Sequence, residues 1–250
     1  MAKMSFEELK DYLDFKVEQY NTPVFIESDP IQLPHRFSKK EDIEIVAFLV
    51  STIAWGQRKS IIKSGERLLE IMEQEPYEFI KNYQATDHHF VHRTFNHIDL
   101  DFFFRSLSSI YANGGLECAF SNHPEIEGVK GRIVRFREQF LSSEHEQRSV
   151  KHLSNPLKNS ATKRINMFLR WMVRNDKRGV DFGIWESISP SELMLPLDVH
   201  TSNNARDLKL LKRTQNDWKA LEELMENLRK FDPNDPVKYD YALFGIGAFE

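Results

Sequence analysis

The sequence has little cysteine, glycine or proline. Of its 250 residues, one is cysteine, ten are glycine and ten are proline. The single cysteine, Cys118, excludes an intramolecular disulfide framework and any zinc or iron–sulfur site built from four cysteines. We expect it to be a small buried hydrophobic residue. The low glycine and proline content excludes collagen-like and low-complexity disordered chains.

Long apolar runs and a strong excess of one charge are also missing. The N-terminal stretch MAKMSFEELKDYLDF is charged where a signal peptide needs an apolar run, and no stretch reaches the roughly 18 apolar residues that span a bilayer. Lysine and arginine total 34 and aspartate and glutamate 38, a net charge of -4. The sequence therefore predicts a soluble cytoplasmic protein without a membrane partner. The mild acidity by itself argues against a nucleic-acid partner.

The sequence does contain hydrophobic residues at helical spacing. A capping-box pattern at Ser5 and Glu8 precedes one apolar face, and the same pattern at Ser38 and Glu41 precedes a helix that is apolar nearly all round. Further helical patterns cover residues 58–74, 99–112, 163–174 and 218–228, and residues 235–236 open a last helix. No segment alternates as a strand does, so the predicted fold class is all-α.

The length allows one or two domains at about 150 residues each. The chain shows no internal repeat, no low-complexity tract and no flexible linker. We interpret residues 1–250 as a single domain of two lobes, with a possible lobe boundary near 112–130. Phe102, Phe103 and Phe104 are expected in its core.

Basic residues are concentrated between residues 151 and 178. This segment holds eight lysines and arginines and one acid, Asp176, so it carries +7 and the rest of the chain carries -11. A local positive face can bind phosphates whatever the overall sign of the charge. The alternative is that Arg170 and Arg174, four residues apart, form the solvated face of an amphipathic helix.

Two segments carry the functional signal. Residues 155–172 are expected to form a polar turn followed by an amphipathic helix, with Lys163 at the start of the helix. In residues 195–206 an extended Leu-Pro-Leu precedes Asp198, which stands next to the start of a polar helix. Unsatisfied N–H groups of a first helical turn stabilise a carboxylate placed there. Taken singly, Lys163 is a surface lysine and Asp198 a helix cap. Their shared context predicts a catalytic pair.

This pair resembles the catalytic lysine and aspartate of the helix-hairpin-helix DNA glycosylases, the superfamily that contains endonuclease III and the 8-oxoguanine glycosylases. Lys163 follows the hairpin, and Leu197-Asp198-Val199-His200 matches the later Val/Leu-Asp-x-His/Arg segment. Their separation of 35 residues is more like that of the archaeal 8-oxoguanine glycosylases. At the family level, residues 163–174 and 235–247 are similar to the signature of an uncharacterised bacterial family of unknown function.

The resemblance implies a two-lobed helix-hairpin-helix glycosylase-like fold, with the hairpin and catalytic segment at 151–206. It implies a base-excision-repair glycosylase and AP lyase that acts on damaged double-stranded DNA, with Lys163 as nucleophile and Asp198 as electrostatic stabiliser. The target base would be flipped out, and Gln57 or Arg58 would fill the gap. The implied nucleic-acid-binding residues are Gln57, Arg58, Asn155, Lys158, Asn159, Arg164 and His200. No cofactor, metal or iron–sulfur cluster is expected.

The hairpin departs from the family because it has Asn155-Pro156-Leu157-Lys158-Asn159 where Gly-x-Gly is usual. Glycines there let backbone N–H groups approach a phosphate closely. An alternative is therefore a non-catalytic nucleic-acid-binding protein that retains the fold, and a third is a helical protein-interaction domain. The lesion, the choice between DNA and RNA, and the oligomeric state are left open.

Other candidate residues receive structural interpretations. A histidine group at 88, 89, 92 and 97 suggests a metal site, but its polar surroundings without helical period favour a solvated loop. Asp217 and Asp240 are interpreted as ordinary helix-cap or surface acids. Trp55 and Trp171 could stack on a base, although core positions are more typical of large aromatic residues.

Overall fold

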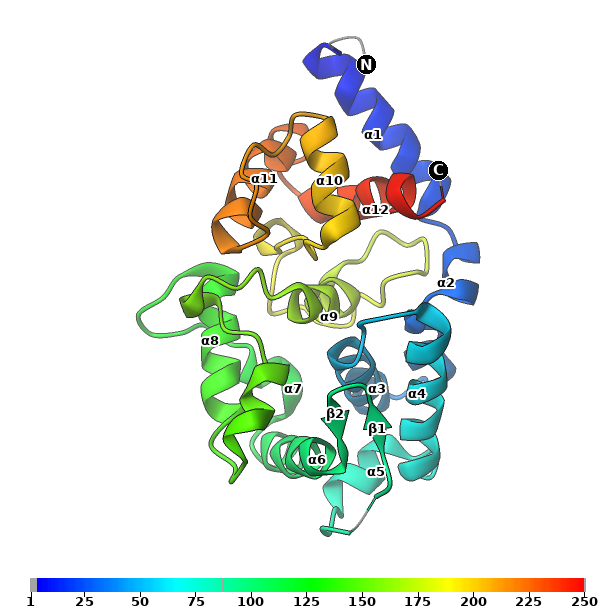
Figure 1. The fold of residues 1–250 in the computed structure, drawn as a ribbon, viewed down its shortest axis with the longest axis vertical. Coiled ribbons are helices and arrows are strands. Elements are labelled where there is room, and N and C mark those ends of the chain that lie inside the picture. Colours follow the sequence, from blue (N-terminus) through cyan, green and yellow to red (C-terminus); the bar gives the residue numbers. More distant parts are fainter. Residues whose placement is uncertain (1–3, 87, 250) are drawn as a thin grey trace. The chain divides into compact units, whose positions relative to one another are not determined.

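The computed structural model describes residues 4–86 and 88–249 (Figure 1). Its helices are α1 (Phe6–Tyr20), α2 (Val24–Ser28), α3 (Lys40–Thr52), α4 (Arg58–Ile71), α5 (Pro76–Lys81), α6 (His97–Ala112), α7 (Gly115–Ala119), α8 (Gly128–Phe140), α9 (Lys163–Val173), α10 (Val199–Asp207), α11 (Trp218–Phe231) and α12 (Tyr239–Phe249). Two short strands, β1 (Val91–His92) and β2 (Phe95–Asn96), pair antiparallel. The prediction of a predominantly helical fold is therefore confirmed. Among the described helices, none combines the length and apolar character that a membrane span requires.

The two predicted capping boxes have different outcomes. At α1 the Ser5 hydroxyl accepts from the backbone N–H of Glu8 at 3.2 Å, and the Glu8 carboxylate accepts from the N–H of Ser5 at 2.7 Å. The box at Ser38 and Glu41 is wrong, because α3 starts only at Lys40 and its N-cap Lys39 makes no side-chain hydrogen bond. The prediction that α3 is buried nearly all round is confirmed, since every residue from 43 to 52 is buried.

The chain divides into two compact units. We call residues 1–25 with 156–250 the terminal unit, and residues 26–155 the inserted unit. Helix α2 contains the boundary between residues 25 and 26. Residues 112–130, where the sequence suggested a lobe boundary, lie within the inserted unit.

Aromatic rings from α3, α6 and α8 form the core of the inserted unit. The Phe48 ring on α3 lies 5.9 Å from that of Phe103 on α6 and 5.4 Å from those of Phe136 and Phe140 on α8. Residues 102–104 are all buried, as expected. Cys118 on the short helix α7 is exposed, so the prediction of a buried cysteine is wrong.

Asp99, in the first turn of α6, is a fully buried acid of the inserted unit. Its carboxylate accepts from the Ser149 hydroxyl at 2.6 Å, from the Arg148 guanidinium at 3.0 Å and from the backbone N–H of Asn96 at 2.9 Å. Burial acts to raise the pKa of Asp99, but hydrogen bonds from His152, Ser149 and Asn96 outweigh it and lower the pKa to about 2. The ionised carboxylate therefore stabilises the folded state.

Replacing Asp99 with asparagine is expected to destabilise the protein by about 2 kcal/mol at pH 7. The depressed pKa gives stability that is complete above the unfolded value near 4 and is lost as the pH falls toward 2. The difference in unfolding free energy between wild type and Asp99→Asn should therefore shrink to about half at pH 3. Urea unfolding at pH 7, 5 and 3 measures it, and a difference that stays constant over this range would contradict the assignment.

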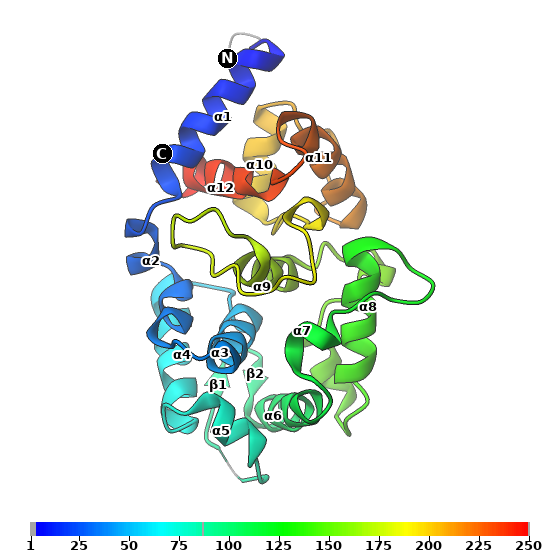
Figure 2. The ribbon, with the colours of Figure 1, turned by 180° about the vertical axis from the view of Figure 1, so that it is seen from behind.

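Helix α12 lies against α1 and α10 in the terminal unit (Figures 1 and 2). The Asn204 amide on α10 donates to the Leu243 carbonyl on α12 at 2.7 Å. A Cβ at Gly247 would lie 3.1 Å from the Cβ of His200, and one at Gly245 would lie 2.1 Å from the Tyr20 ring. Glycine at these two positions lets α12 approach both neighbours closely.

Candidate active site

The turn before α9 is held by left-handed residues and by the start of α11. Asn159 has φ 61° and Thr162 has φ 45°. The Asn159 carbonyl accepts from the backbone N–H of Trp218 at 3.0 Å, and its side-chain amide donates to Asp217 at 2.8 Å. Asparagine tolerates the left-handed region better than most residues, so position 159 adopts this conformation without a glycine.

Asp217 links this turn to α11. It is the N-cap of α11, as predicted, and accepts from the backbone N–H of Ala220 at 3.0 Å. It also accepts from the Arg213 guanidinium at 2.7 Å. The hydrogen bond from Arg213 is the largest cause that holds the pKa of Asp217 well below its usual range. The turn is thus attached to an acid that remains ionised.

The turn and α10 bring Lys163 and Asp198 together. The Lys163 Nζ lies 3.2 Å from the Asp198 Oδ2. The other carboxylate oxygen, Oδ1, accepts from the backbone N–H of Thr201 at 2.8 Å and so caps α10. The lysine side chain is 38% exposed and that of the aspartate 14%. Asp198 is therefore a helix cap and the partner of an amine that solvent can reach.

Two arginines continue the face of α9 that Lys163 begins. Arg170 and Arg174 follow it by seven and eleven residues, spacings that return to the same side of a helix. Both arginines are buried. They therefore form neither the phosphate-binding face nor the solvated face that the basic segment suggested, and both interpretations are wrong for them.

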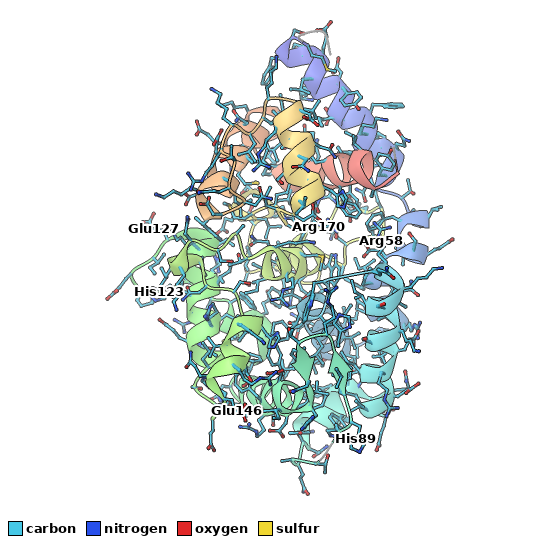
Figure 3. The ribbon with its side chains drawn as sticks, viewed as in Figure 1. Arg58, His89, His123, Glu127, Glu146 and Arg170 are labelled. Atoms are coloured by element: carbon cyan, nitrogen blue, oxygen red, sulfur yellow. The ribbon has the colours of Figure 1, made fainter. Side chains whose placement is uncertain are left out.

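Aspartates from three other segments neutralise these arginines. Arg170, labelled on α9 in Figure 3, pairs with Asp240 through Nη1 and with Asp181 through Nε, at 3.2 Å for the latter. Arg174 binds Asp181 at 3.1 Å and Asp235 at 2.9 Å. The interpretation of Asp240 as an ordinary cap or surface acid is wrong, since its side chain is 7% exposed and paired.

We call this arrangement the charge row; it consists of three cations that share one face of α9 and its C-cap, together with the acids bound to them, namely Lys163, Arg170, Arg174, Asp176, Asp181, Asp198, Asp235 and Asp240. The lysine at one end of the row is accessible to solvent, whereas the two arginines are buried. Burial raises the pKa of Asp240 to about 6, against the effect of Arg170 and with a smaller contribution from the charge of Asp198. Asp240 was not among the predicted site residues, although the spacing of Lys163, Arg170 and Arg174 along one helix face indicates a need for buried acids.

The other predicted nucleic-acid-binding residues are distributed over both units. In the terminal unit Lys158 and His200 are exposed, whereas Arg164 is partly buried and burial lowers the pKa of its guanidinium to about 10. In the inserted unit Gln57 is the exposed N-cap of α4. Arg58 begins that helix (Figure 3) and Asn155 ends the unit. Asn159 is bound to Asp217, as described above.

Trp55 and Trp171 differ in exposure. Trp171 is fully buried and belongs to the core of the terminal unit, whereas Trp55 in the inserted unit is partly exposed. The Trp55 ring stacks on His152, with 5.9 Å between ring centroids. A role in stacking on a base is therefore compatible with the exposure of Trp55 alone.

The predicted solvated histidine loop is wrong for His92. This residue is buried in β1, where its ring bonds the Ser64 hydroxyl at 2.8 Å and the Trp55 carbonyl at 3.2 Å. The Thr86 hydroxyl bonds the ring of His88 at 2.8 Å, and His89 is exposed (Figure 3). Over residues 4–86 and 88–249, no three histidine, cysteine, aspartate or glutamate side chains are grouped so as to hold a metal ion.

Comparison of the chain with curated proteins and with solved structures gives no match. A family described as protein of unknown function (DUF2400) matches residues 29–249. The match includes every residue of the charge row. The chain therefore belongs to the DUF2400 family.

Proposed function

We propose that the protein is a DNA glycosylase with AP lyase activity that acts on a damaged base in double-stranded DNA, within a helix-hairpin-helix glycosylase-like fold. The Lys163–Asp198 pair carries the proposal: an amine and a carboxylate 3.2 Å apart, placed at two helix starts, with the amine open to solvent. An ion pair with a purely structural role would not require the lysine amine to be exposed to solvent.

The chemistry assigns a different task to each partner. As the bond between base and sugar breaks, the base leaves with the bonding electrons, and the Asp198 carboxylate stabilises the positive charge that develops on the sugar. Lys163, after giving up a proton to solvent, attacks C1′ with its lone pair, and one proton of the attached amine then passes to the ring oxygen O4′. Opening of the sugar ring gives a Schiff base, and loss of a C2′ proton then expels the 3′ phosphate by β-elimination.

Borohydride trapping on a panel of duplexes tests the proposal. Duplexes carrying 8-oxoguanine, uracil, an oxidised pyrimidine or an abasic site are incubated with the folded protein, and borohydride reduces any Schiff base to a stable amine. We expect a covalent adduct with the abasic duplex and with at least one damaged base. Folded protein that forms no adduct with any of these duplexes would refute the lyase assignment.

A non-catalytic nucleic-acid-binding protein is the second candidate. Its support is the hairpin, which has Asn159 and Thr162 in left-handed conformations in place of the usual glycines. It predicts DNA affinity that falls steeply with salt, as phosphate contacts require. It also predicts that affinity survives Lys163→Ala and Asp198→Ala and that no duplex is cleaved. Absence of any salt-dependent affinity would leave the protein-interaction alternative.

A further inference from the structure

We propose that Asp240 is a positioning residue for Lys163: through Arg170 and Asp198, its charge sets how readily the Lys163 amine reacts. This inference rests on the proposed function, in which Lys163 is the reactive amine. It goes further by including a buried carboxylate of α12 that neither the resemblance nor the family description assigns.

The arrangement of α9 supports this link. Lys163 and Arg170 lie on one face of the helix, about 10 Å apart along its axis. Each binds an aspartate from a different helix: Lys163 binds Asp198 at the start of α10, and Arg170 binds Asp240 on α12. Helices α10 and α12 pack together through the hydrogen bond from Asn204 to Leu243. The two acid–base pairs are thus fixed to one frame of three helices.

Burial strengthens the electrostatic effect that the charge of Asp240 has on groups along α9. The side chains of Arg170 and Asp240 are 6% and 7% exposed, and the Arg170 guanidinium lies 4.4 Å from the centre of the Tyr241 ring. Little water is left to screen them, so a charge here acts further than it would at the surface. The charge of Asp198 also contributes to raising the pKa of Asp240, in line with the packing of α10 against α12.

The charged groups around Asp240 come from several segments of the terminal unit, and the Arg174 guanidinium lies 5.5 Å from the centre of the adjacent Tyr241 ring. Those that act on Asp240 are Arg170 on α9, Asp181 in the segment after α9, and Asp198 on α10. On the α1 side of α12, the Tyr239 hydroxyl donates to Asp14 at 3.0 Å. Because the pKa of Asp240 is raised to about 6, its charge is present above that pH and lost below it.

Chemical labelling of Lys163 by acetic anhydride, quantified by mass spectrometry, tests the inference without DNA. Only the neutral amine reacts, and a nearby negative charge favours the protonated form. At pH 7.5, Asp240→Asn should therefore raise the labelling rate of Lys163 between about twofold and tenfold. The matched control is Asp235→Asn, which also removes a carboxylate from a buried arginine. The charges acting on Asp235 come from Arg174, Asp232 and Asp181. We expect it to leave the rate within about 1.5-fold of wild type.

A pH profile separates this charge effect from a structural one. Below pH 6 Asp240 becomes neutral, so the rates of wild type and Asp240→Asn should converge there and diverge above. Wild type alone gives the same test if the variant does not fold. The labelling rate of Lys163 relative to that of Lys219, an exposed lysine on α11, should be higher at pH 5 than at pH 7.5. Equal effects of the two variants, or a relative rate that is flat from pH 5 to 7.5, would overturn the inference.

These outcomes are independent of the trapping experiment. If wild type forms no DNA adduct but labelling depends on Asp240, the proposed function fails and the inference about Asp240 stands. If wild type forms the adduct and labelling is insensitive to Asp240, the reverse holds.

Discussion

Lys163→Ala is expected to remove the covalent adduct with abasic DNA, lowering its rate of formation by about three orders of magnitude or more. The reason is that no other residue of the proposed mechanism supplies the amine that becomes the Schiff base. The fold should be preserved, since the Lys163 side chain is 38% exposed and its partner Asp198 is also satisfied by the N–H of Thr201. Borohydride trapping under single-turnover conditions measures the loss, and circular dichroism verifies the fold.

Asp198→Asn should have a different effect, which makes it the informative companion. Asparagine caps helices about as well as aspartate, so α10 should be retained. Release of a damaged base should slow by about 10²- to 10³-fold, because the carboxylate no longer stabilises the cationic transition state. Trapping on an abasic duplex should persist, because no glycosidic bond remains to be broken. Equal losses of both reactions in this variant would contradict the division of tasks between the two residues.

Arg174→Ala is expected to destabilise the protein by about 3–5 kcal/mol. The Arg174 side chain is 2% exposed and neutralises Asp181, which is completely buried, as well as Asp176 and Asp235. Removing the guanidinium leaves buried carboxylates without their partner, which costs more free energy than the pairs themselves contribute. Urea unfolding of wild type and variant at pH 7 measures the difference.

A surface pair of the same unit is the control. Lys230 lies 3.8 Å from Glu226 one turn before it on α11, and both side chains are mostly exposed. Such pairs contribute little to stability, so Lys230→Ala should change the unfolding free energy by less than about 1 kcal/mol. Comparable losses for Arg174→Ala and Lys230→Ala would show that burial of the charge row does not have the energetic consequence assigned to it.

Local spacing predicted the helical elements well and the charged partners poorly. The period of apolar residues predicted α9 and α11, and Ser5 with Glu8 predicted the start of α1, because these signals lie within one or two turns of the chain. The hairpin β1–β2 has two residues in each strand, too few to show an alternating pattern. The capping box at Ser38 did not form, because α3 begins at Lys40 and its N-cap is Lys39.

The charge row shows why a sequence count of charge differs from a surface charge. Arg170 and Arg174 were counted with the basic segment, but their acids lie up to 70 residues away in the sequence. No local rule joins Arg170 to Asp240 across that separation. The pairing of Lys163 with Asp198 was predicted because their two segments together resemble a known catalytic lysine and aspartate; a turn before a helix and a helix cap, each taken alone, would not have joined them. Their partners deeper in the row have no such context.

Identification of the residue that carries the trapped DNA tests the central claim most directly. The borohydride-reduced adduct of wild-type protein with an abasic duplex is digested with nuclease and protease, and the modified peptide is sequenced by mass spectrometry. We expect the modification to lie on Lys163. A modification on another lysine, such as Lys158, or on the N-terminal amine would contradict it.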